Sequence, residues 1–397
     1  MTLFPEPFTN LCNFWKKQKT AVVGRQFFKN NEKMRKILKQ VCVLLATALL
    51  GVSVSCGQFD VGDFQTSFGE FTEEDVISIS NSDISVHFLQ LGNQFTGDCT
   101  LIKTGDQEIL IDAGSRKGSA ETIVPYIEQF CEDGVLEYVV ATHAHQDHIA
   151  GFVGTEKAKG VFESFVCETI IDYPKANTTS KIRSEYEALR DQEVAEGAVH
   201  YTALECLKNE NVGLFEIADG ITMQILYQRF YEDKASSEND YSVCLLITAG
   251  EDHFLFTGDL EEKGEKSLVE NNVLPKCVLY KAGHHGSKTS NTETLLSVIQ
   301  PEIVCVCCCC GSDEYTDAVE NMFPTQAFVD RIALYTDKVY VTTVVANNAD
   351  GFAPMNGTIV VESNDGTFSL RCSNNAILFK DSVWFQENRT CPIAWLG

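Results

Sequence analysis

Basic residues are scarce in this sequence, and their scarcity limits what the protein can bind. The 397 residues include 31 Lys and Arg against 56 Asp and Glu, so the formal net charge is −25. Residues 1–39 carry nine basic and two acidic side chains, which leaves the remainder with a net charge of −32. A dedicated nucleic-acid-binding protein usually presents a basic face. The charge therefore disfavours that class, although bound metal ions can still attract an anion locally.

The sequence also lacks a long hydrophobic run, which excludes a bundle of membrane-spanning helices. Its most apolar stretch, residues 41–54, is shorter than the ~20 residues that a transmembrane helix needs. Lys36 and Lys39 precede it, and a positive flank before a short apolar region is typical of an export signal peptide. The small residues around Cys56 resemble the lipid-attachment box of bacterial lipoproteins. We therefore expect an extracytoplasmic lipoprotein held at the membrane by its N-terminal segment; the alternatives are an uncleaved anchor or a cytoplasmic protein.

A regular cysteine spacing of the kind that marks a disulfide framework is also missing. After Cys56 the chain holds thirteen cysteines, an odd number, and most of them lie singly within apolar runs. This pattern favours a protein kept reduced, either inside a cell or outside an anaerobe. The dense run at 305–310 invites a metal-cluster interpretation. Because adjacent residues of a strand point to opposite faces, we favour a buried strand instead.

The chain divides by pattern into four parts. Residues 1–56 form the basic segment and the anchor, and residues 57–83 are acidic and without a clear period, so we interpret them as a linker. In residues 84–372 hairpin patterns come first and strand–helix alternation follows, which indicates one layered α/β domain. Residues 373–397 form a tail to which no pattern assigns a role.

The run His143-Ala144-His145-Gln146-Asp147-His148 packs four potential metal ligands into six residues. His143 and His145 share one face of an extended turn, so their imidazoles can bind one ion. Asp147 and His148 point elsewhere and can bind a second ion. Nitrogen and carboxylate ligands together suit Zn²⁺, Mn²⁺ or Fe²⁺. The alternative, a solvated histidine-rich loop, seldom shows this density of ligands.

Four further segments accompany this run in a fixed order: 92–102, 110–114, 254–259 and 281–290. Together with 142–151 they resemble the metallo-β-lactamase superfamily, and within it most closely the hydrolase domain of ComEC-type competence proteins. The resemblance covers roughly residues 84–365. It implies a four-layer αββα sandwich with the site at one edge between the two sheets.

The resemblance also implies roles for individual residues. Asp259 would bridge two metal ions, and one of His284 and His285 would complete the ligands of the second ion. Neighbouring residues diverge, so the other of these two histidines would lie in a supporting position. Asp112 would lie beneath the site and orient a ligand, as metal-bound histidines require. Ser287 would belong to the same supporting layer.

Two positions depart from the family pattern. The wider family places a further metal-binding histidine between the central motif and the bridging aspartate, and His200 is the candidate for that ligand. Its alternative is a surface residue without a role. The later His-Pro pair of the family is replaced by Phe323-Pro324, so any function of that histidine is absent. We expect His87 and His253 to be structural.

The implied reaction is hydrolysis by a metal-bridging hydroxide. Two divalent ions, Zn²⁺ or Mn²⁺, would lower the pKa of a bridging water and hold it as hydroxide. Asp147 and His148 would stand at the catalytic centre, and the expected substrate is a phosphodiester, with nucleic acid included. Lys281, Lys288 and Ser290 flank the last ligand, where they would contact phosphate oxygens or simply shape the turn.

Two other functions stay open at this point. A hydrolase of a small ester, a lactone or a phosphocholine-type group would suit the acidic body better than a nuclease. A non-catalytic metal-binding or scaffold protein is the alternative of another class. The intact ligand set argues against the scaffold, because metal-site residues serve no purpose there. The sequence indicates no protein partner.

Overall fold

Two β-sheets dominate the computed structural model, which describes residues 57–61, 64–208, 213–346, 351–364 and 366–396. The segment 41–54 and Cys56, on which the anchor prediction rests, lie outside the described residues. Among the helices in the described part, none is long and apolar enough to cross a bilayer.

The first sheet has ten strands and the second has eight. The strands of the first, in spatial order, are β1 (Gly57–Val61), β2 (Phe64–Phe68), β18 (Thr367–Cys372), β17 (Ile359–Asn364), β3 (Ile84–Phe88), β4 (Thr100–Thr104), β5 (Gln107–Ile111), β6 (Val135–Val140), β7 (Val166–Asp172) and β8 (Val199–Thr202). Those of the second are β16 (Phe352–Pro354), β15 (Val339–Val345), β14 (Ile303–Cys310), β13 (Leu279–Lys281), β12 (Asp252–Phe256), β11 (Cys244–Ala249), β10 (Ile221–Leu226) and β9 (Leu214–Ala218).

Each sheet changes from antiparallel to parallel pairing along its width, and this positions the loops of the site. Strands β3 to β5 pair antiparallel, and β5 to β8 pair parallel. In the second sheet β9 to β12 are antiparallel and β12 to β15 are parallel. Ligand sites of α/β folds lie beyond the carboxyl ends of parallel strands. The loops after β5, β6, β12, β13 and β14 are therefore the expected place for a site.

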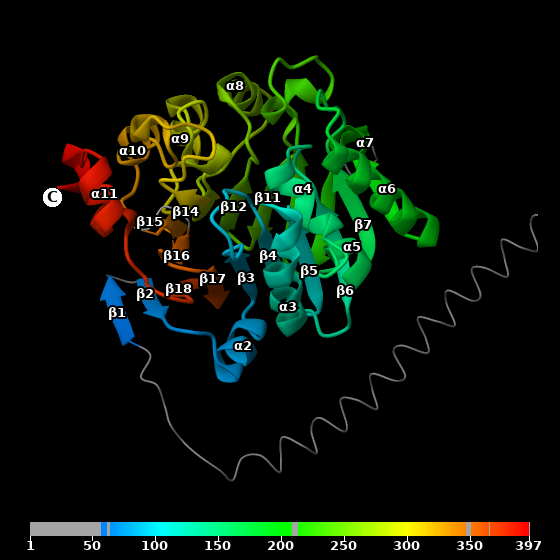
Figure 1. Ribbon diagram of the computed structural model, residues 1–397, viewed down its shortest axis with the longest axis horizontal. Coiled ribbons are helices and arrows are strands. Elements are labelled where there is room, and N and C mark those ends of the chain that lie inside the picture. The colour runs from blue at the N-terminus through cyan, green and yellow to red at the C-terminus, as the bar shows by residue number, and fades with distance from the viewer. Residues whose placement is uncertain (1–56, 62–63, 209–212, 347–350, 365, 397) are drawn as a thin grey trace, which may run out of the picture. The chain divides into compact units, whose positions relative to one another are not determined.

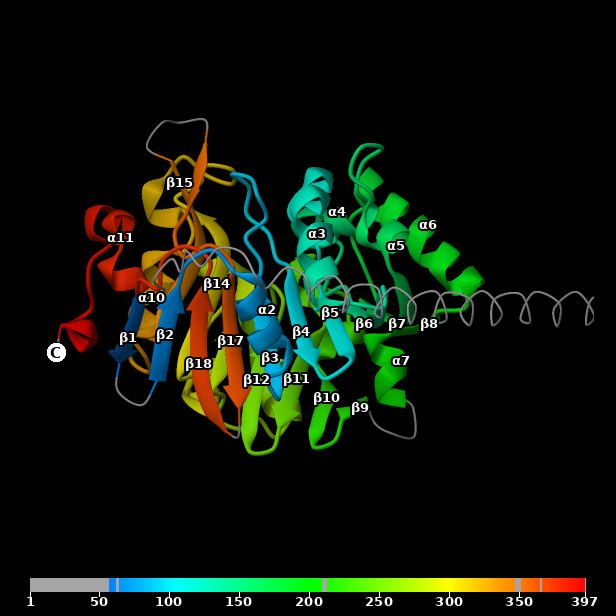
Figure 2. The same ribbon diagram turned by 90° about the horizontal axis from the view of Figure 1, so that it is seen from below.

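Helices gather on two opposite sides of the sheets, with α3 to α6 beside β5 to β7 and α8 to α10 beside β12 to β15 (Figure 1). The view turned by 90° keeps α3 to α6 apart from α10 and α11 (Figure 2). The helices are α2 (Glu73–Ser80), α3 (Ala120–Phe130), α4 (Gln146–Val153), α5 (Val161–Ser164), α6 (Lys181–Glu196), α7 (Ala203–Lys208), α8 (Glu262–Asn271), α9 (Glu293–Ile299), α10 (Gln326–Ile332) and α11 (Val383–Asn388).

Alternating side chains place one core between the sheets and another beneath the helices of the second sheet. Phe254 and Phe256 of β12 join the larger cluster, which also contains Val86 of the first sheet. Leu255, between them in sequence, joins the other cluster together with Phe328 of α10. Successive residues of a strand point to opposite faces, so both faces of β12 are covered. The fold is therefore the predicted four-layer αββα sandwich.

The strand β14 decides how the cysteine-rich run is used. All eight of its residues are buried, and the thirteen cysteines in the described part of the chain are free thiols. Cys305 and Cys307 face the core between the sheets, while Cys308 and Cys310 face the helices. The side chains diverge, so the buried strand is correct and the metal-cluster interpretation is wrong.

The structure corrects the prediction of a linker at residues 57–83. This segment contains β1, β2 and α2, and Phe64 and Ile79 are buried in the larger core. Strand β2 pairs in parallel with β18, close to the C-terminus, so the order of this segment depends on residues far away in the sequence. The tail 373–397 is also packed, because Phe379 and Phe385 are buried against the second sheet's core.

Candidate metal centre

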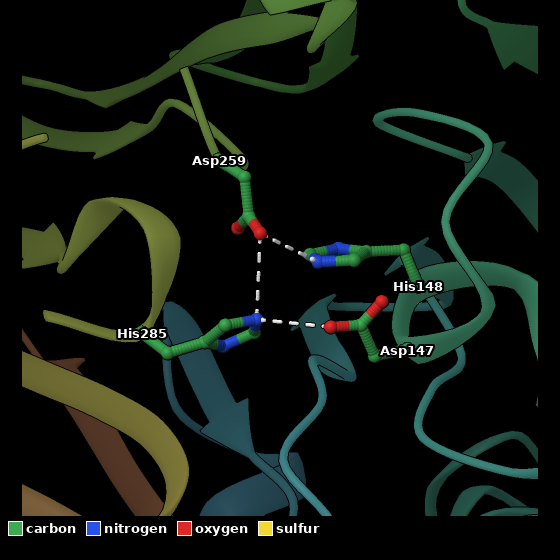
Figure 3. Close-up of side chains that lie close together, drawn as sticks. All are labelled: Asp147, His148, Asp259 and His285. Atoms are coloured by element: carbon green, nitrogen blue, oxygen red, sulfur yellow. Dashed lines mark ion pairs between the residues drawn. The ribbon is translucent and has the colours of Figure 1, made fainter. Parts of the chain in front are cut away.

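Loops at the carboxyl ends of β6, β12 and β13 bring together the side chains that the sequence motifs single out. The loop after β6 leads into α4, whose first turn holds Asp147 and His148. Asp259 follows β12, and His285 lies in the short helix η4 (Gly283–Gly286) after β13. Figure 3 shows these four side chains converging from three loops. We call them the four-residue cluster.

The ligand atoms of the four-residue cluster lie within 4.8 Å of one another. Asp259 Oδ2 is 3.2 Å from His148 Nε2 and 3.4 Å from His285 Nε2. His285 Nε2 is also 3.5 Å from Asp147 Oδ2. Two imidazoles and two carboxylates at this spacing form a donor set that suits a divalent ion such as Zn²⁺ or Mn²⁺.

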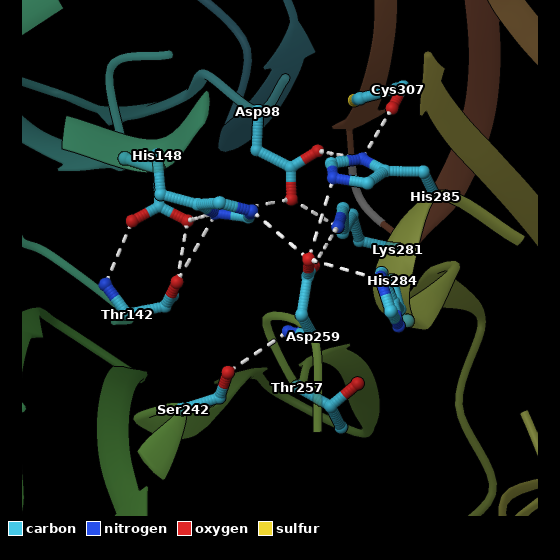
Figure 4. Close-up of polar contacts among 12 residues, drawn as sticks. Asp98, Thr142, His148, Ser242, Thr257, Asp259, Lys281, His284, His285 and Cys307 are labelled. Carbon is cyan, nitrogen blue, oxygen red and sulfur yellow. Dashed lines mark hydrogen bonds and ion pairs between the residues drawn. The ribbon is translucent and has the colours of Figure 1, made fainter. Parts of the chain in front are cut away.

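Asp112 fixes the orientation of His148. Its Oδ2 lies 2.7 Å from His148 Nδ1, while Thr142 donates from its hydroxyl to Oδ2 at 2.8 Å and from its backbone N–H to Oδ1 at 2.7 Å. Because Nδ1 of His148 donates to this carboxylate, its Nε2 is left facing Asp259 (Figure 4). These contacts are what the predicted orienting role of Asp112 requires.

The structure distinguishes His285 from His284. His285 is 1% exposed, and its Nδ1 donates to the carbonyl oxygen of Cys307 at 2.8 Å, which leaves Nε2 for the cluster. The two residues have φ values of 48° and 54°, in the left-handed region, and this turn separates their rings. His284 Nδ1 instead lies 3.1 Å from Thr289 Oγ1, and its Nε2 is 3.9 Å from Asp259 Oδ2.

Asp98 is a residue of the site that sequence reasoning missed. It is buried, forms an ion pair with the buried Lys281, and places Oδ1 3.2 Å from His285 Nδ1. Lys281 Nζ also lies 4.0 Å from Asp259 Oδ1. Lys281 is thus held by carboxylates beneath the cluster rather than exposed to a phosphate. No local pattern marks Asp98, because its partners come from the second sheet.

His143 and His145 form a second pair of imidazoles near Asp259, and the ring centroid of His143 lies 4.1 Å from that of His148. His143 Nε2 is 3.0 Å from His145 Nδ1 and 3.9 Å from Asp259 Oδ2. His200 goes elsewhere: it lies on β8, where its Nε2 is 2.9 Å from Asp172 Oδ1 at the end of β7. The structure therefore brings the first pair of predicted ligands to the site and gives His200 a different partner.

The residues after the last ligand mainly shape the turn. Ser287 Oγ lies 3.0 Å from Thr289 Oγ1 and accepts the Thr289 backbone N–H at 3.2 Å. Lys288 Nζ donates to Asn321 Oδ1 at 2.7 Å, and Ser290 is fully buried. Ser287 supports His284 through Thr289, which is an indirect form of the predicted supporting role.

Three buried atoms of the four-residue cluster have no hydrogen-bond partner among the described residues: His148 Nε2, His285 Nε2 and Asp259 Oδ1. Leaving a buried polar atom without a partner costs about 1–3 kcal/mol, and folded proteins rarely do so. Both imidazole nitrogens are turned toward the centre of the cluster (Figure 3), and each offers a lone pair to an ion once its proton has left. The residues present therefore fit a divalent metal ion.

The charges of the cluster shift the pKa values of its members against the effect of burial. Burial acts to lower the pKa of His148 and His285, yet Asp259 and a second carboxylate beside each ring raise it well above its usual value. Burial acts to raise the pKa of Asp259, but the neighbouring imidazoles hold it well below its usual range. The carboxylate is thus ionised, as a metal ligand must be. A divalent ion in place of the imidazole protons would preserve this balance of charge.

A pocket of about 400 Å³ opens onto the cluster, and three of its residues were not singled out by the sequence. Tyr315, in the loop after β14, donates from its hydroxyl to Asp147 Oδ2 at 2.8 Å. Glu314, its neighbour, forms an ion pair with Arg116 across the mouth of the pocket. The contacts join positions far apart in the sequence, so no motif could reveal them. The remaining lining residues include His145, Gln146 and His284.

Comparison with known proteins supports the same family as the motifs. Residues 92–224 match the family model described as "Metallo-beta-lactamase superfamily". The chain is 30% identical over 214 residues to Recombination protein 2 of Haemophilus influenzae, covering 53% of this chain and 23% of that protein. It is 28% identical over 174 residues to ComE operon protein 3 of Bacillus subtilis, covering 42% and 19%. With Competence protein ComA of Neisseria gonorrhoeae the identity is 27% over 250 residues, covering 61% and 29%.

The chain spans less than a third of the length of these curated relatives. Among solved structures, it is similar to the metallo-beta-lactamase fold protein YhfI from Bacillus subtilis, with 12% identity, a TM-score of 0.38, and coverage of 66% of this chain and 97% of that chain. Human tRNase Z, short form, gives 12% identity, a TM-score of 0.32, and coverage of 70% and 98%. The matched family model covers a third of the chain, so residues 92–224 are similar to the metallo-β-lactamase superfamily, and the αββα architecture and the His/Asp cluster agree with that likeness.

Proposed function

We propose that this chain is a two-metal phosphodiesterase whose substrates include nucleic acid. The observation that carries the proposal is the four-residue cluster, in which two imidazole nitrogens and a carboxylate oxygen are buried without hydrogen-bond partners among the described residues. Asp147, Asp259 and His285 of this cluster line a pocket. His143, His145 and Asp259 would hold one ion. Asp147, His148, Asp259 and His285 would hold the other, with Asp259 shared.

Divalent ions in this site would supply a Lewis acid for the phosphoryl oxygens and a water of lowered pKa as the nucleophile. The protein's own contribution is orientation. Asp112 keeps the proton of His148 on Nδ1, and the Cys307 carbonyl does the same for His285, so that both Nε2 atoms are available. The Asp98–Lys281 pair supports the cluster from beneath and keeps water out of that side.

The phosphodiester class is supported by the curated relatives, which are named for competence and recombination. The open pocket also supports it, because a polymer needs an entrance rather than a closed cavity. We further propose, from the segment ending at Cys56, that the protein is exported and anchored at the membrane. Labelling cells with a palmitate analogue tests the lipid on Cys56, and recovery of intact, unprocessed protein in the cytosolic fraction would refute export.

The function is tested on the full chain purified in the presence of Mn²⁺ or Zn²⁺. We expect about two ions per chain by elemental analysis and hydrolysis of bis-p-nitrophenyl phosphate. His148→Ala should reduce that hydrolysis by orders of magnitude, because it removes a ligand from the site. The matched control is His253→Ala, because His253 pairs with Thr248 on the β11–β12 hairpin, away from the cluster. Cleavage of aryl esters or lactones with no cleavage of phosphodiesters would refute the phosphodiesterase and identify the protein as a hydrolase of small esters.

A further inference from the structure

The loop 311–323, between β14 and α10, closes one side of the pocket through polar contacts. None of its residues is buried. Glu314 Oε2 accepts the backbone N–H of Thr96 at 3.0 Å, and its Oε1 forms an ion pair with Arg116 NH2. Tyr315 adds the hydrogen bond to Asp147 described above. The loop therefore reaches the first sheet through a few polar atoms, and Arg116 provides the only cation among these contacts.

Arg116 is held in place by neighbours that leave it one carboxylate partner in the described part of the chain. Its NH1 donates to the backbone oxygen of Ser115 at 2.9 Å, and its guanidinium lies 4.0 Å from the ring centroid of Phe95. With its amide turned so that the oxygen faces Arg116, Gln146 accepts from Nε at 3.2 Å. Glu314 is the partner that neutralises the charge. A planar, fixed guanidinium of this kind matches the geometry of a phosphate.

We propose that Arg116 is the phosphate-binding group of the pocket, and that Glu314 is an internal carboxylate which occupies Arg116 until the phosphate of a substrate displaces it. The inference deepens the proposed phosphodiesterase function and rests on it for the identity of the substrate. Arg116 would bind the phosphate group of the substrate that lies next to the reacting centre. The proposal concerns binding and specificity, and no proton transfer is attributed to Arg116.

The energetics favour an exchange of partners over a fixed strut. The side chain of Arg116 is 30% exposed and that of Glu314 is 11% exposed, so water reaches the Arg116 end of the pair and weakens it relative to a fully buried ion pair. A phosphodiester, like a carboxylate, offers two oxygens and one negative charge to the same fork, so it can take the place of Glu314. The net charge of −25 repels anions from the protein as a whole. A fixed cation beside the pocket would therefore add to the attraction of the metal ions for an anionic substrate.

The two members of the ion pair give opposite expectations, and this makes the test decisive. Binding of inorganic phosphate and of thymidine 5′-monophosphate to the metal-loaded full chain is measured by calorimetry. Arg116→Gln should weaken both by about tenfold or more, because a charge-assisted hydrogen bond is lost. Glu314→Gln should tighten both by a few-fold, because the competing carboxylate is gone. Arg116→Lys, which keeps the charge and loses the fork, should lie between wild type and Arg116→Gln.

A purely structural ion pair predicts a different result. In that case Arg116→Gln and Glu314→Gln would change phosphate affinity in the same direction, or leave it alone, while lowering the melting temperature equally; either outcome overturns the proposal. Arg229→Gln removes the exposed pair with Asp233 and serves as the matched control for the loss of one positive charge. Wild-type hydrolysis of bis-p-nitrophenyl phosphate is measured in parallel. Its absence would refute the phosphodiesterase, while the opposed binding shifts would still decide the role of Arg116.

Discussion

Two pairs of imidazoles lie near Asp259, and they differ in how the fold holds them: His148 with His285, and His143 with His145. Nδ1 of His148 is bonded to a buried carboxylate at 2.7 Å, and Nδ1 of His285 to a backbone carbonyl at 2.8 Å. Both acceptors are fixed by sheets. Each ring is therefore oriented before any ion arrives.

The rings of His143 and His145 are held by weaker contacts. Nδ1 of His143 meets only the hydroxyls of Thr142 and Ser242, at 3.2 and 3.4 Å. His145 is partly exposed, and its hydrogen bond is to His143 itself, at 3.0 Å. In the two-metal site proposed above, the position beside His148 and His285 would be preorganised, and the position beside His143 and His145 would be assembled by its ion. We therefore expect the ion on the His148–His285 side to be the tighter of the two.

The largest effect should come from the residue that both sides share. Asp259→Asn should weaken metal binding at both positions and so remove the difference in their metal affinity. Hydrolysis of bis-p-nitrophenyl phosphate should fall by about a thousandfold or more. The control is Asp252→Asn, at the first residue of β12, the strand that Asp259 follows. This variant should keep its activity. A variant at Asp259 that still carried both ions would contradict the shared position.

Removing one side at a time should separate the two positions. His145→Ala should keep one ion that resists dialysis against a chelator, whereas His285→Ala should lose that resistant ion. The measurement is elemental analysis at increasing chelator concentration. His284→Ala is the matched control. His284 is next to His285 in the sequence, but its own imidazole is turned toward Thr289, so this variant should keep the resistant ion. The reverse order of loss would mean that the preorganised side is not the tighter one.

A smaller effect is expected from the carboxylate that orients His148. Asp112→Asn keeps the size of the side chain but weakens its bond to Nδ1, so metal affinity on that side should fall by about 10–100-fold. Competition with a fluorescent chelator measures this change. Asp106→Asn, in the exposed turn between β4 and β5, controls for the loss of one negative charge. Equal affinities in the two variants would show that Asp112 only supports the fold.

The last prediction concerns stability and not metal binding: His87 is as buried as His148 but has hydroxyl partners instead of carboxylates. Tyr126 and Ser85 each lie 2.8 Å from one of its ring nitrogens. Burial, and then the charge of Lys103, lowers its pKa from 6.5 to about 3. The folded protein keeps this ring neutral, while the unfolded chain takes up a proton below pH 6.5. Its contribution to stability is therefore present above 6.5 and is lost as the pH falls toward 3, by about 1.4 kcal/mol per pH unit.

Chemical denaturation at several pH values below 6.5 measures this loss. His87→Gln retains hydrogen-bonding atoms without the titrating ring, so its free energy of unfolding should depend less steeply on pH. His253→Gln is the comparison: burial lowers the pKa of this partly exposed ring too, so the slope should fall, but by less than in His87→Gln. Identical slopes in all three proteins would show that His87 is not the group that titrates.

The sequence predicted the parts of the site that are local in the chain. The run from His143 to His148 is legible because four ligands lie within six residues, and the strands before Asp112 and Asp259 are short apolar runs. The choice between His284 and His285 could not be read, because it depends on two left-handed residues and on the carbonyl of Cys307. These contacts exist only once β13 and β14 are paired.

The elements that the sequence missed share one physical cause. Phe64 and Ile79 are buried because β2 pairs with a strand about 300 residues later, so their segment shows no periodicity of its own. Asp98 and Lys281 come from different sheets, as do Arg116 and Glu314. Where both partners of a contact lie far apart in the chain, neither residue carries a signal by itself.

The buried strand of cysteines has a consequence for handling the protein in air. Burial raises the pKa of Cys305 and Cys308 well above that of an ordinary thiol, so in the native state these sulfurs stay protonated and react slowly with oxidants. Unfolding exposes the twelve buried thiols of the described residues, and Cys305 and Cys308 regain their ordinary acidity. The opened chain can then cross-link to itself and to its neighbours before it refolds. Burial of the thiols in the native fold thus prevents the oxidation that would block refolding. Unfolding by heat in the presence of oxygen should be irreversible, and a reducing agent should make it reversible.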